Sequence, residues 1–466
     1  MITKVFNIVI YGALLISSAP YHCATMPAWV NEHSEINTQN HHGDTPLIHA
    51  IASARTDTTH AIDFLIANGA DPLQPARDGT TPLHLANHLH HVAITQAIFS
   101  AIMRHKKPVV GPSFSMLIAD LKLSTDGHVT FLELGEGPLS YFKGHDALYP
   151  KGLIWQRFWQ HLAQKKLPMW YVGDLARAKR ETTIIDATTF KDCGGMFCKS
   201  LHELEATTNF KNIIERARKA GMPQAGFVLL RHHTTNVAMR NYFKKNYPEI
   251  TLINDPVRQF ASSKFMTNLL FTDDDTLQNF RPVCHAYAKE YSSALITAIH
   301  EDFASHDLMV IKPLNAANGW GVIIAAHESL DHELKKILYN KKALEGLDDP
   351  TYSYWPTDKN EHFLVEAFVP SKPICINHRE YDATMRQVFI LESNASTIDV
   401  TFIGSYWKLP ALPINSTGSL TALHKSNVKS GNKPSAIVSP EDDAIARHAL
   451  RFALPKMYTK MLQCLS

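Results

Sequence analysis

From about residue 112 to the C-terminus, short apolar runs alternate with stretches whose apolar positions recur at helical spacing. Runs typical of strands lie at 114–121, 128–134, 170–172, 226–230 and 250–255. Helical spacing is found at 152–165, 210–220 and 236–247. Because strand, helix and strand follow one another at these intervals, the pattern predicts a parallel α/β layer. Helical sequence closes the chain from about residue 440, with an expected interruption at Pro455.

A different pattern precedes this region and occurs twice. Thr45-Pro46-Leu47 and Thr81-Pro82-Leu83 each open an apolar helical stretch, with a threonine able to cap the helix and a proline in its first turn. Gly69-Ala70-Asp71 ends the first unit. The pattern resembles the ankyrin repeat, at a spacing slightly longer than its usual period of about 33 residues. It implies a short α-helical ankyrin stack over 43–110, with room for a third, capping repeat between 87 and 104, docked on a neighbouring domain.

The first residues have the pattern of a targeting segment. Lys4 precedes an apolar run at 5–16, and small residues follow up to Ala19 and Ala24. This predicts a secretory signal peptide over 1–24 and a polar linker over 25–42. An N-terminal membrane anchor at 5–19 is the alternative. After cleavage, no stable membrane insertion of the mature chain is expected.

Composition limits the range of functions. The chain has 466 residues with 45% apolar side chains, enough for two or three globular domains. With 46 basic and 44 acidic residues, charge gives no case for nucleic-acid binding. Six cysteines are too few for a disulfide framework, and the histidine clusters lack acidic or cysteine partners at metal-ligand spacing.

A lysine followed by a glycine-rich turn is the clearest chemical signal. Lys312 ends a short apolar run that begins at Val310, Gly319 and Gly321 lie in the turn, and a second apolar run covers 322–326. This predicts a hairpin whose tip closes over a ligand, with turn amides suited to phosphate oxygens. The alternative is an ordinary hairpin in which Lys312 protects an edge strand.

From residue 114 onward, several such elements in order resemble the ATP-grasp superfamily of carboxylate–amine ligases. They are the strand end at 253–256, Ser262-Ser263-Lys264, the Lys312 hairpin, the segment 363–370 and the strand 379–391. The chain contains no Walker-type phosphate loop. The resemblance implies a multidomain protein in which the ankyrin stack precedes an α/β substrate domain at 113–260 and an α+β ATP-grasp domain at 261–466.

The resemblance also implies roles for particular residues. The ATP phosphates would be contacted by two lysines and covered by the hairpin tip: Lys264, Lys312, Asn318, Gly319 and Gly321. Glu366 would line the adenine slot and Asp382 would contact the ribose or a metal. Arg386 would stabilise the transferring phosphoryl oxygens, and Arg379 would hold the acceptor carboxylate. Each has a simpler alternative: Lys264 a solvated helix residue, Glu366 a paired surface acid, Arg386 a local partner of Asp382.

One departure concerns magnesium. The family holds Mg²⁺ with an acidic strand followed by Glu-x-Asn near its end. Here the only Glu-x-Asn of this domain is Glu392-Ser393-Asn394, which lies before the late substrate-type loop at 427–431 and has the pattern of a hairpin turn. Glu392 and Asn394 are therefore weak candidate ligands. Either other acids such as Asp382 hold the metal, or the site is degenerate.

The sequence thus favours an ATP-dependent ligase that uses ATP and Mg²⁺ and activates a carboxylate for attack by an amine. The repeats suggest a protein substrate or partner. Two alternatives stay open: an interaction protein with a degenerate nucleotide site, and a kinase that stops at a phosphorylated product. A signal peptide on an ATP-dependent enzyme suggests a secreted effector delivered into a host cell.

Overall fold

The computed structural model describes residues 36–54, 59–105, 111–137, 142–173, 187–230, 236–261, 263–272, 274–316, 319–394, 397–426 and 434–465. The expected signal peptide, most of the linker, Asn318 and the late loop at 427–431 lie outside these residues. Within them, no helix combines the length and apolarity needed to cross a membrane.

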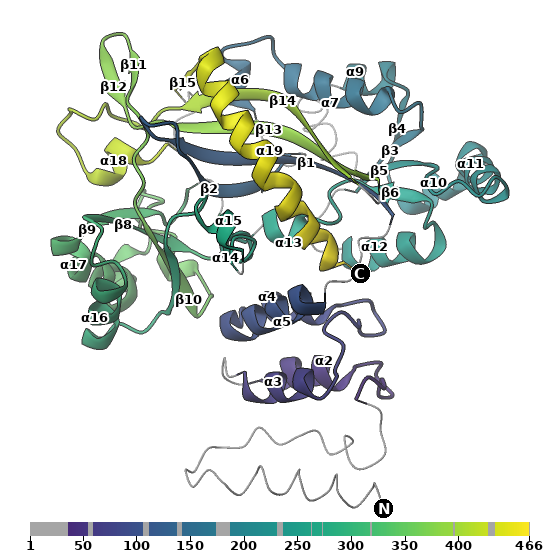
Figure 1. The fold of residues 1–466 in the computed structure, drawn as a ribbon, viewed down its shortest axis with the longest axis horizontal. Helices are drawn as coiled ribbons and strands as arrows, with labels where there is room; N and C mark the ends of the chain where they lie inside the picture. Colours follow the sequence, from purple (N-terminus) through teal and green to yellow (C-terminus); the bar gives the residue numbers. More distant parts are fainter. Residues whose placement is uncertain are drawn as a thin grey trace, which may run out of the picture.

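A five-stranded antiparallel sheet forms the centre of the molecule (Figure 1). Its order is β15-β14-β13-β1-β2. The strands are β1 (Pro112–Leu123), β2 (Val129–Glu136), β13 (Thr384–Asn394), β14 (Ile398–Lys408) and β15 (Ser435–Ala436). Since β1 pairs with β13 and β13 with β14, the predicted boundary between domains at residue 260 runs through one sheet. Strand pairing over such distances cannot be read from periodicity, which reports only local structure.

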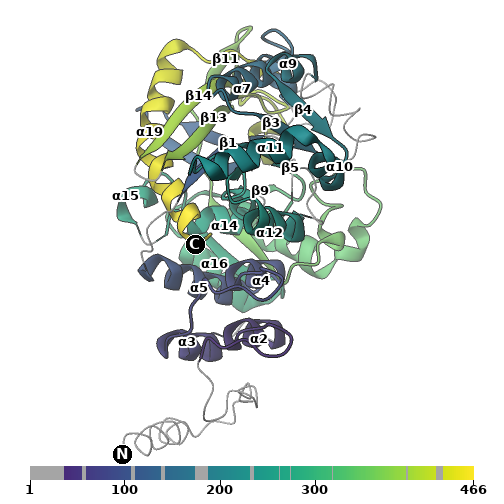
Figure 2. The same ribbon diagram turned by 90° about the vertical axis from the view of Figure 1, so that its right-hand side faces the viewer.

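The long helix α19 (Pro440–Gln463) covers one face of this sheet (Figures 1 and 2). Ser439 caps it, and Glu441, Asp442 and Asp443 lie in its first turn, where the helix dipole favours acids. The predicted interruption at Pro455 is wrong, because the helix runs through it. The flanking residues Leu454, Met457 and Tyr458 are buried in the main core, and this packing offsets the lost backbone hydrogen bond.

A four-stranded parallel sheet packs beside the central sheet and confirms the predicted α/β layer. Its order is β4-β3-β5-β6. The strands are β3 (Met169–Val172), β4 (Gly195–Cys198), β5 (Gly226–Leu230) and β6 (Ile250–Leu252). Helix α6 (Lys143–Asp146) contacts β14 and β15 of the central sheet. The helices that accompany the parallel sheet are α7 (Leu153–Ala163), α9 (Ala187–Asp192), α10 (Leu201–Ala206), α11 (Thr208–Lys219) and α12 (Asn236–Asn246). Aromatic residues of α7 share a core with both sheets.

A second, smaller antiparallel sheet has the order β7-β10-β8-β9 and its own core. Its strands are β7 (Cys284–Ala288), β8 (Leu308–Pro313), β9 (Ile323–Ala326) and β10 (His362–Ala367). The predicted lysine hairpin is confirmed, since β8 and β9 pair antiparallel from Leu308↔Ala326 to Ile311↔Ile323. Around it lie α16 (Ser293–Asp302), η3 (His327–Ser329), α17 (Leu330–Leu334), η4 (Lys335–Tyr339), η5 (Lys341–Leu344) and η6 (Trp355–Thr357).

Short elements join these layers. Between the parallel sheet and the small sheet are α13 (Arg258–Ala261), α14 (Lys264–Leu269) and α15 (Asp275–Gln278). After the small sheet, β11 (Ile374–Ile376) and β12 (Arg379–Tyr381) form a separate two-stranded hairpin. Helix α18 (Leu420–His424) contacts β9.

Four helices form a stack below the body (Figures 1 and 2). They are α2 (Pro46–Ser53), α3 (His60–Ala67), α4 (Pro82–His88) and α5 (Val92–His105). The expected caps are confirmed: Thr45 accepts from the Ile48 N–H and Thr81 from the His84 N–H, each at 3.2 Å. The stretch 87–104, where the sequence allows a third repeat, is occupied mainly by α5, which pairs with α4 as the second helix of the second unit.

The helical stack is part of the body of the protein. Helix α5 contacts α14 and α19, and Phe99 of α5 lies edge-on to Phe260 at 6.3 Å between ring centroids. One continuous core contains residues of the stack, of the central sheet and of α19. A short stack cannot bury enough apolar surface alone, so this docking provides what it lacks.

We predict that Phe99→Ala lowers the free energy of unfolding by roughly 3–5 kcal/mol, because it leaves a cavity where the stack meets the body. Urea denaturation measures the loss. Phe64→Ala in α3 is the matched control, since Phe64 is 41% exposed; its cost should be below about 1 kcal/mol. Equal losses in the two variants would contradict the integrated core.

Candidate functional site

Lys312 and Glu366 meet on the small sheet. Glu366 of β10 lies opposite Val310 of β8, so Lys312 is its diagonal neighbour on the same face. The Lys312 amine donates to one oxygen of Glu366 and the Arg281 guanidinium to the other. Burial would raise the pKa of Glu366, but Arg281 and Lys312 lower it. Glu366 is thus a buried acid, only 1% exposed, shared by two cations rather than a surface residue.

Lys264 reaches the same place from a different element. It is the first residue of α14, whose N-terminus is capped by Ser263. Its amine donates to the carbonyl of Ala316, and its backbone N–H donates to Leu314 at 3.0 Å, so both groups hold the loop that follows Lys312. Burial lowers the pKa of Lys264; Glu133 opposes this, and Lys312 adds to it. The structure therefore brings Lys264, Lys312 and Glu366 together in what we call the lysine cluster, with Arg281 as its fourth member.

A row of polar side chains crosses the central sheet beside this cluster. Glu133, Asp120, Arg386 and Tyr406 lie directly opposite one another on β2, β1, β13 and β14. Directly opposite residues of an antiparallel sheet point to the same face. We call these four the charged row. Its end at Glu133 lies 3.8 Å from the Lys264 amine, which joins the row to the lysine cluster.

Asp120 is the centre of the row. It accepts two hydrogen bonds from Arg386, at 2.8 and 2.9 Å, and one from the Lys408 amine at 2.5 Å. Burial alone would raise the pKa of Asp120, but Arg386 and Lys408 hold it well below its usual range. Burial, reinforced by Arg386, lowers the pKa of Lys408 to about 8 against the attraction of Asp120. Arg386 therefore pairs with Asp120, not with Asp382 as the alternative had it.

Asp382 has partners of its own. Its carboxylate accepts from the Lys122 amine at 2.6 Å and from the Ser371 N–H at 2.6 Å, and lies 2.8 Å from His424 Nδ1. The residue is 1% exposed. Because these groups occupy both oxygens, the structure gives no support to Asp382 as a ribose or metal ligand in this conformation.

The loop after Lys312 is tightly packed where it is described. Gly319 and Gly321 both have φ near 70°, a conformation that favours glycine. A Cβ on Gly321 would lie 2.4 Å from the Pro313 ring, and the Gly321 N–H donates to Pro350 at 3.0 Å. Both lysines of the cluster are buried, and the Lys264 amine is held by the carbonyl of Ala316 in this loop.

The predicted metal pair lies elsewhere. Glu392 and Asn394 are at the end of β13 that pairs with Phe114 and Pro112, whereas Arg386 pairs with Asp120. There Glu392 contacts His161 at 2.6 Å and Lys165 at 2.5 Å. The position of this pair follows from the hairpin that the sequence predicted, since Asn394 Oδ1 accepts from the Thr397 N–H across the turn. The pair cannot face phosphates held by Lys264 and Lys312.

Among the described residues, no three histidine, cysteine or acidic side chains are grouped as metal ligands. The acids near the lysine cluster are Asp120, Glu133, Glu366 and Asp382, and each has a cationic partner. A magnesium site therefore does not fit the residues as they lie here.

Arg379 is exposed on β12. The β11–β12 hairpin projects at the top of Figure 1, whereas β8 and β10 lie well below it, about half-way down the picture. The structure does not bring Arg379 to the lysine cluster.

Sequence reasoning missed four charged residues of the site: Asp120, Glu133, Arg281 and Lys408. A signal existed for Asp120, because it interrupts the apolar run of β1, and a charge in such a run requires a partner. Arg281 follows α15 in a short connection and does not interrupt an apolar run, so its sequence neighbours give no such signal. Its role appears only in three dimensions, where it also donates to the carbonyls of Phe131 and Leu132 on β2, at 3.0 and 2.6 Å.

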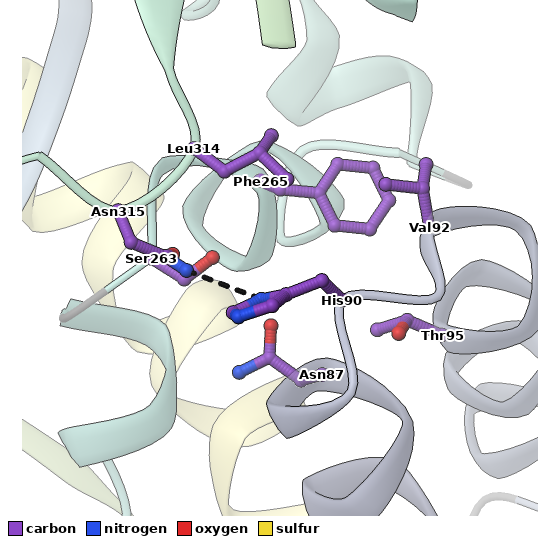
Figure 3. A pocket seen from close by; sticks show the side chains of 8 residues that line it. All are labelled: Asn87, His90, Val92, Thr95, Ser263, Phe265, Leu314 and Asn315. Carbon is purple, nitrogen blue, oxygen red and sulfur yellow. Dashed lines mark hydrogen bonds between the residues drawn. The ribbon is translucent and has the colours of Figure 1, made fainter. Parts of the chain in front are cut away.

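The helical stack touches the loop that follows Lys312 (Figure 3). His90, between α4 and α5, has a left-handed backbone with φ 62°, and its Nδ1 lies 3.4 Å from the Asn315 side-chain nitrogen. Asn315 also donates to Asn360 at 3.3 Å. The contact borders a cavity of about 10 Å³, room for about one water. Its lining comes from both sides: Asn87, His90, Val92, Thr95, Ser263, Phe265, Leu314 and Asn315.

Comparison with known proteins gives only distant similarity. No family model and no curated protein matches the chain. A protein provisionally named gamma-glutamylcysteine synthetase from Methylobacillus flagellatus KT aligns with a TM-score of 0.38 and 10% identity, over 82% of this chain and 93% of that one. A glutathione synthetase-like effector from Globodera pallida aligns at 0.32 and 11%, over 70% and 81%. A D-cycloserine synthetase aligns at 0.31 and 12%, over 62% and 82%. Similarity this low does not establish a shared function, which has to be argued from the site.

We predict that Asp120→Asn lowers the free energy of unfolding by roughly 3–5 kcal/mol at pH 7, because two buried cations lose their counter-charge. The depressed pKa of Asp120 means that its contribution is present at neutral pH and is lost as the pH falls below about 4, where the unfolded chain takes up the proton first. Denaturation at pH 7 and pH 3 should show the difference between variant and wild type shrinking on acidification. The exposed Asp307→Asn is the control; a similar loss there would contradict the pairing argument.

We predict that His90→Gly loosens the loop after Lys312 without unfolding the stack, because glycine keeps the left-handed backbone and removes the imidazole. The Lys264 amide, which donates to Leu314 of that loop, should exchange with solvent roughly fivefold faster. Hydrogen exchange followed by NMR measures this, with β13 amides as the internal reference. Unchanged exchange at Lys264 would show that the stack does not restrain the loop.

Proposed function

We propose that this protein is an ATP-dependent ligase that activates a carboxylate as an acyl phosphate for attack by an amine. The observation that carries the proposal is the convergence of Lys264 and Lys312, from a helix start and a strand end, beside a glycine-containing loop. Two ammonium groups in one place suit a triphosphate, which carries about four negative charges. The order of these elements along the chain resembles that of ATP-grasp ligases.

In the proposed reaction, Lys264 and Lys312 hold the ATP phosphates and Arg386 offsets the charge on the transferring group. A carboxylate oxygen of the substrate attacks the γ-phosphorus, and the bond from that phosphorus to the ADP oxygen breaks. An amine nitrogen then attacks the acyl carbon, phosphate leaves and the amine gives up a proton. Magnesium was expected from the resemblance, but the described residues do not fit it, so no step is assigned to it.

The helical stack supports a protein as substrate or partner within this proposal. Stacked helix pairs of this kind present extended surfaces for binding proteins. Through His90, the stack contacts the loop beside Lys264, so a bound partner and the nucleotide would lie on connected parts of the chain. A secreted effector acting in a host cell is the setting that would combine such a partner with a supply of ATP.

A second candidate function is nucleotide binding without turnover by an interaction protein. The position of Glu392 and Asn394, at the far end of β13, favours it. Under this alternative, the body would serve as a nucleotide-dependent support for the stack.

We predict that Lys264→Ala and Lys312→Ala each weaken ATP binding about tenfold or more, because each removes a charge-assisted hydrogen bond to a phosphate. Calorimetric titration measures the affinity. Lys219→Ala in the exposed last turn of α11 is the matched control and should bind as wild type does. Thermal unfolding of every variant checks folding. Equal binding by all four proteins would remove the proposed role of both lysines.

The same proteins separate the alternatives by turnover. Release of ADP and phosphate that needs both a carboxylate and an amine supports the ligase. ADP release with a stable phosphorylated product supports the kinase, and binding with no ADP release supports the second candidate.

A further inference from the structure

The acids around the lysine cluster are arranged as counter-ions rather than as metal ligands. Asp120 is held between Arg386 and Lys408, Glu366 between Arg281 and Lys312, and Asp382 beside Lys122. Only Glu133 has a largely accessible side chain, 40% exposed. It is therefore the point at which the cluster opens to solvent.

Glu133 is surrounded by positive charge. Lys264 lies 3.8 Å away, and the carboxylate also acts electrostatically on Arg281, Arg386 and Lys408. A divalent cation placed at this carboxylate would be repelled by the Lys264 amine close by and by three further protein cations. A metal ion is thus disfavoured at the one acid it could reach.

The balance of charge favours an anion instead. In the described part of the chain, the lysine cluster, the charged row and the adjoining Lys408 contain five cations: Lys264, Arg281, Lys312, Arg386 and Lys408. They contain three acids, Asp120, Glu133 and Glu366. Five against three leaves two positive charges in excess. Buried excess charge is costly, and an incoming anion would relieve that cost.

We infer that Arg386 of the charged row and the adjoining Lys408 take the place of a metal ion, so that the site binds nucleotide phosphates without Mg²⁺ and Glu133 competes with those phosphates. This inference rests on the proposed function and concerns the same site. It identifies the ligand form as the free, fully charged nucleotide.

The arrangement of the two cations suits this role. Asp120 fixes Arg386 through two parallel hydrogen bonds, so its guanidinium is already ordered before any ligand arrives. Lys408 also pairs with Asp120, and its lowered pKa means that it loses its proton more readily than an ordinary lysine. An added phosphate would give Lys408 a second counter-charge. Fixed cations of this kind need no reorganisation when the anion binds.

Glu133→Gln tests the inference directly. If Glu133 competes with phosphate, its neutralisation should tighten ATP and ADP binding about fivefold in EDTA. If Glu133 were instead a ligand of Mg²⁺, the same variant should weaken binding in Mg²⁺. Calorimetric titration of wild type and variant with each nucleotide, in EDTA and in Mg²⁺, distinguishes the two. Glu215→Gln on the exposed face of α11 is the control and should change nothing.

Lys408 supplies an independent test. Lys408→Gln should weaken binding in EDTA about tenfold, and Mg²⁺ should not restore it. Lys408→Arg should keep wild-type affinity. The charged groups that face Lys408 are Arg386, Asp120 and Glu133. Wild-type affinity in EDTA should fall between pH 7 and 9 as Lys408 loses its proton, and Lys408→Arg, which stays charged, should remove the part of the fall due to this group. This comparison holds even if Lys408→Gln fails to fold.

The outcomes separate the inference from the proposed function. Wild-type binding in EDTA within about threefold of that in Mg²⁺ supports the inference. Binding that occurs only in Mg²⁺, or that weakens in Glu133→Gln, overturns the inference and leaves the proposed function standing. No binding of ATP in either condition overturns both.

Discussion

The carboxylate of Glu366 is where the two antiparallel sheets are held together. Arg281 donates to it and also to two carbonyls of β2, while Lys312 of β8 holds its other oxygen. An acid so deeply buried stays ionised because both its oxygens face cations; removing either cation would leave it with one counter-charge, and removing Glu366 would leave two buried cations without theirs. The position of the small sheet against the central one, and so the distance from Lys312 to the charged row, depends on these contacts.

Along one face of the central sheet, the side chains change from apolar to charged, and the candidate site lies at the charged end. On β1 that face presents Met116 and Ile118, which pack under α7, and then Asp120 and Lys122, which are charged. The opposite face packs beneath α19 and is mainly apolar, with Ser115 hydrogen-bonded to Tyr458 and Gln387 to Asp443 of that helix. Apolar packing at one end thus fixes the strands rigidly enough to hold ion pairs at the other. The cost of burying those charges is offset by pairing Asp120 with Arg386 on β13 and Lys122 with Asp382 just before that strand.

The sequence predicted local structure well and long-range structure poorly. The parallel layer, the Lys312 hairpin and the caps at Thr45 and Thr81 all follow from signals within a few residues of each other. The pairing of β1 with β13 does not, because no local pattern specifies which distant strand completes a sheet. The uninterrupted helix at Pro455 has the same explanation, since tertiary packing overrides a local breaking signal. Within the site, Lys264, Lys312 and Glu366 were identified from motifs, whereas Arg281 and Lys408 became visible only through their partners.

The β1–β13 pairing also affects how the chain must be made. Asp120 and Arg386 are separated by 266 positions, so β1 can pair with β2 early but not with β13 until most of the polypeptide has left the ribosome. Such high contact order slows folding and leaves apolar strand edges open to aggregation in the meantime. A nascent chain in this condition is a natural client for chaperones. It would also stay unfolded, and so able to pass through a narrow channel, for longer than a chain whose sheets form between strands adjacent in sequence.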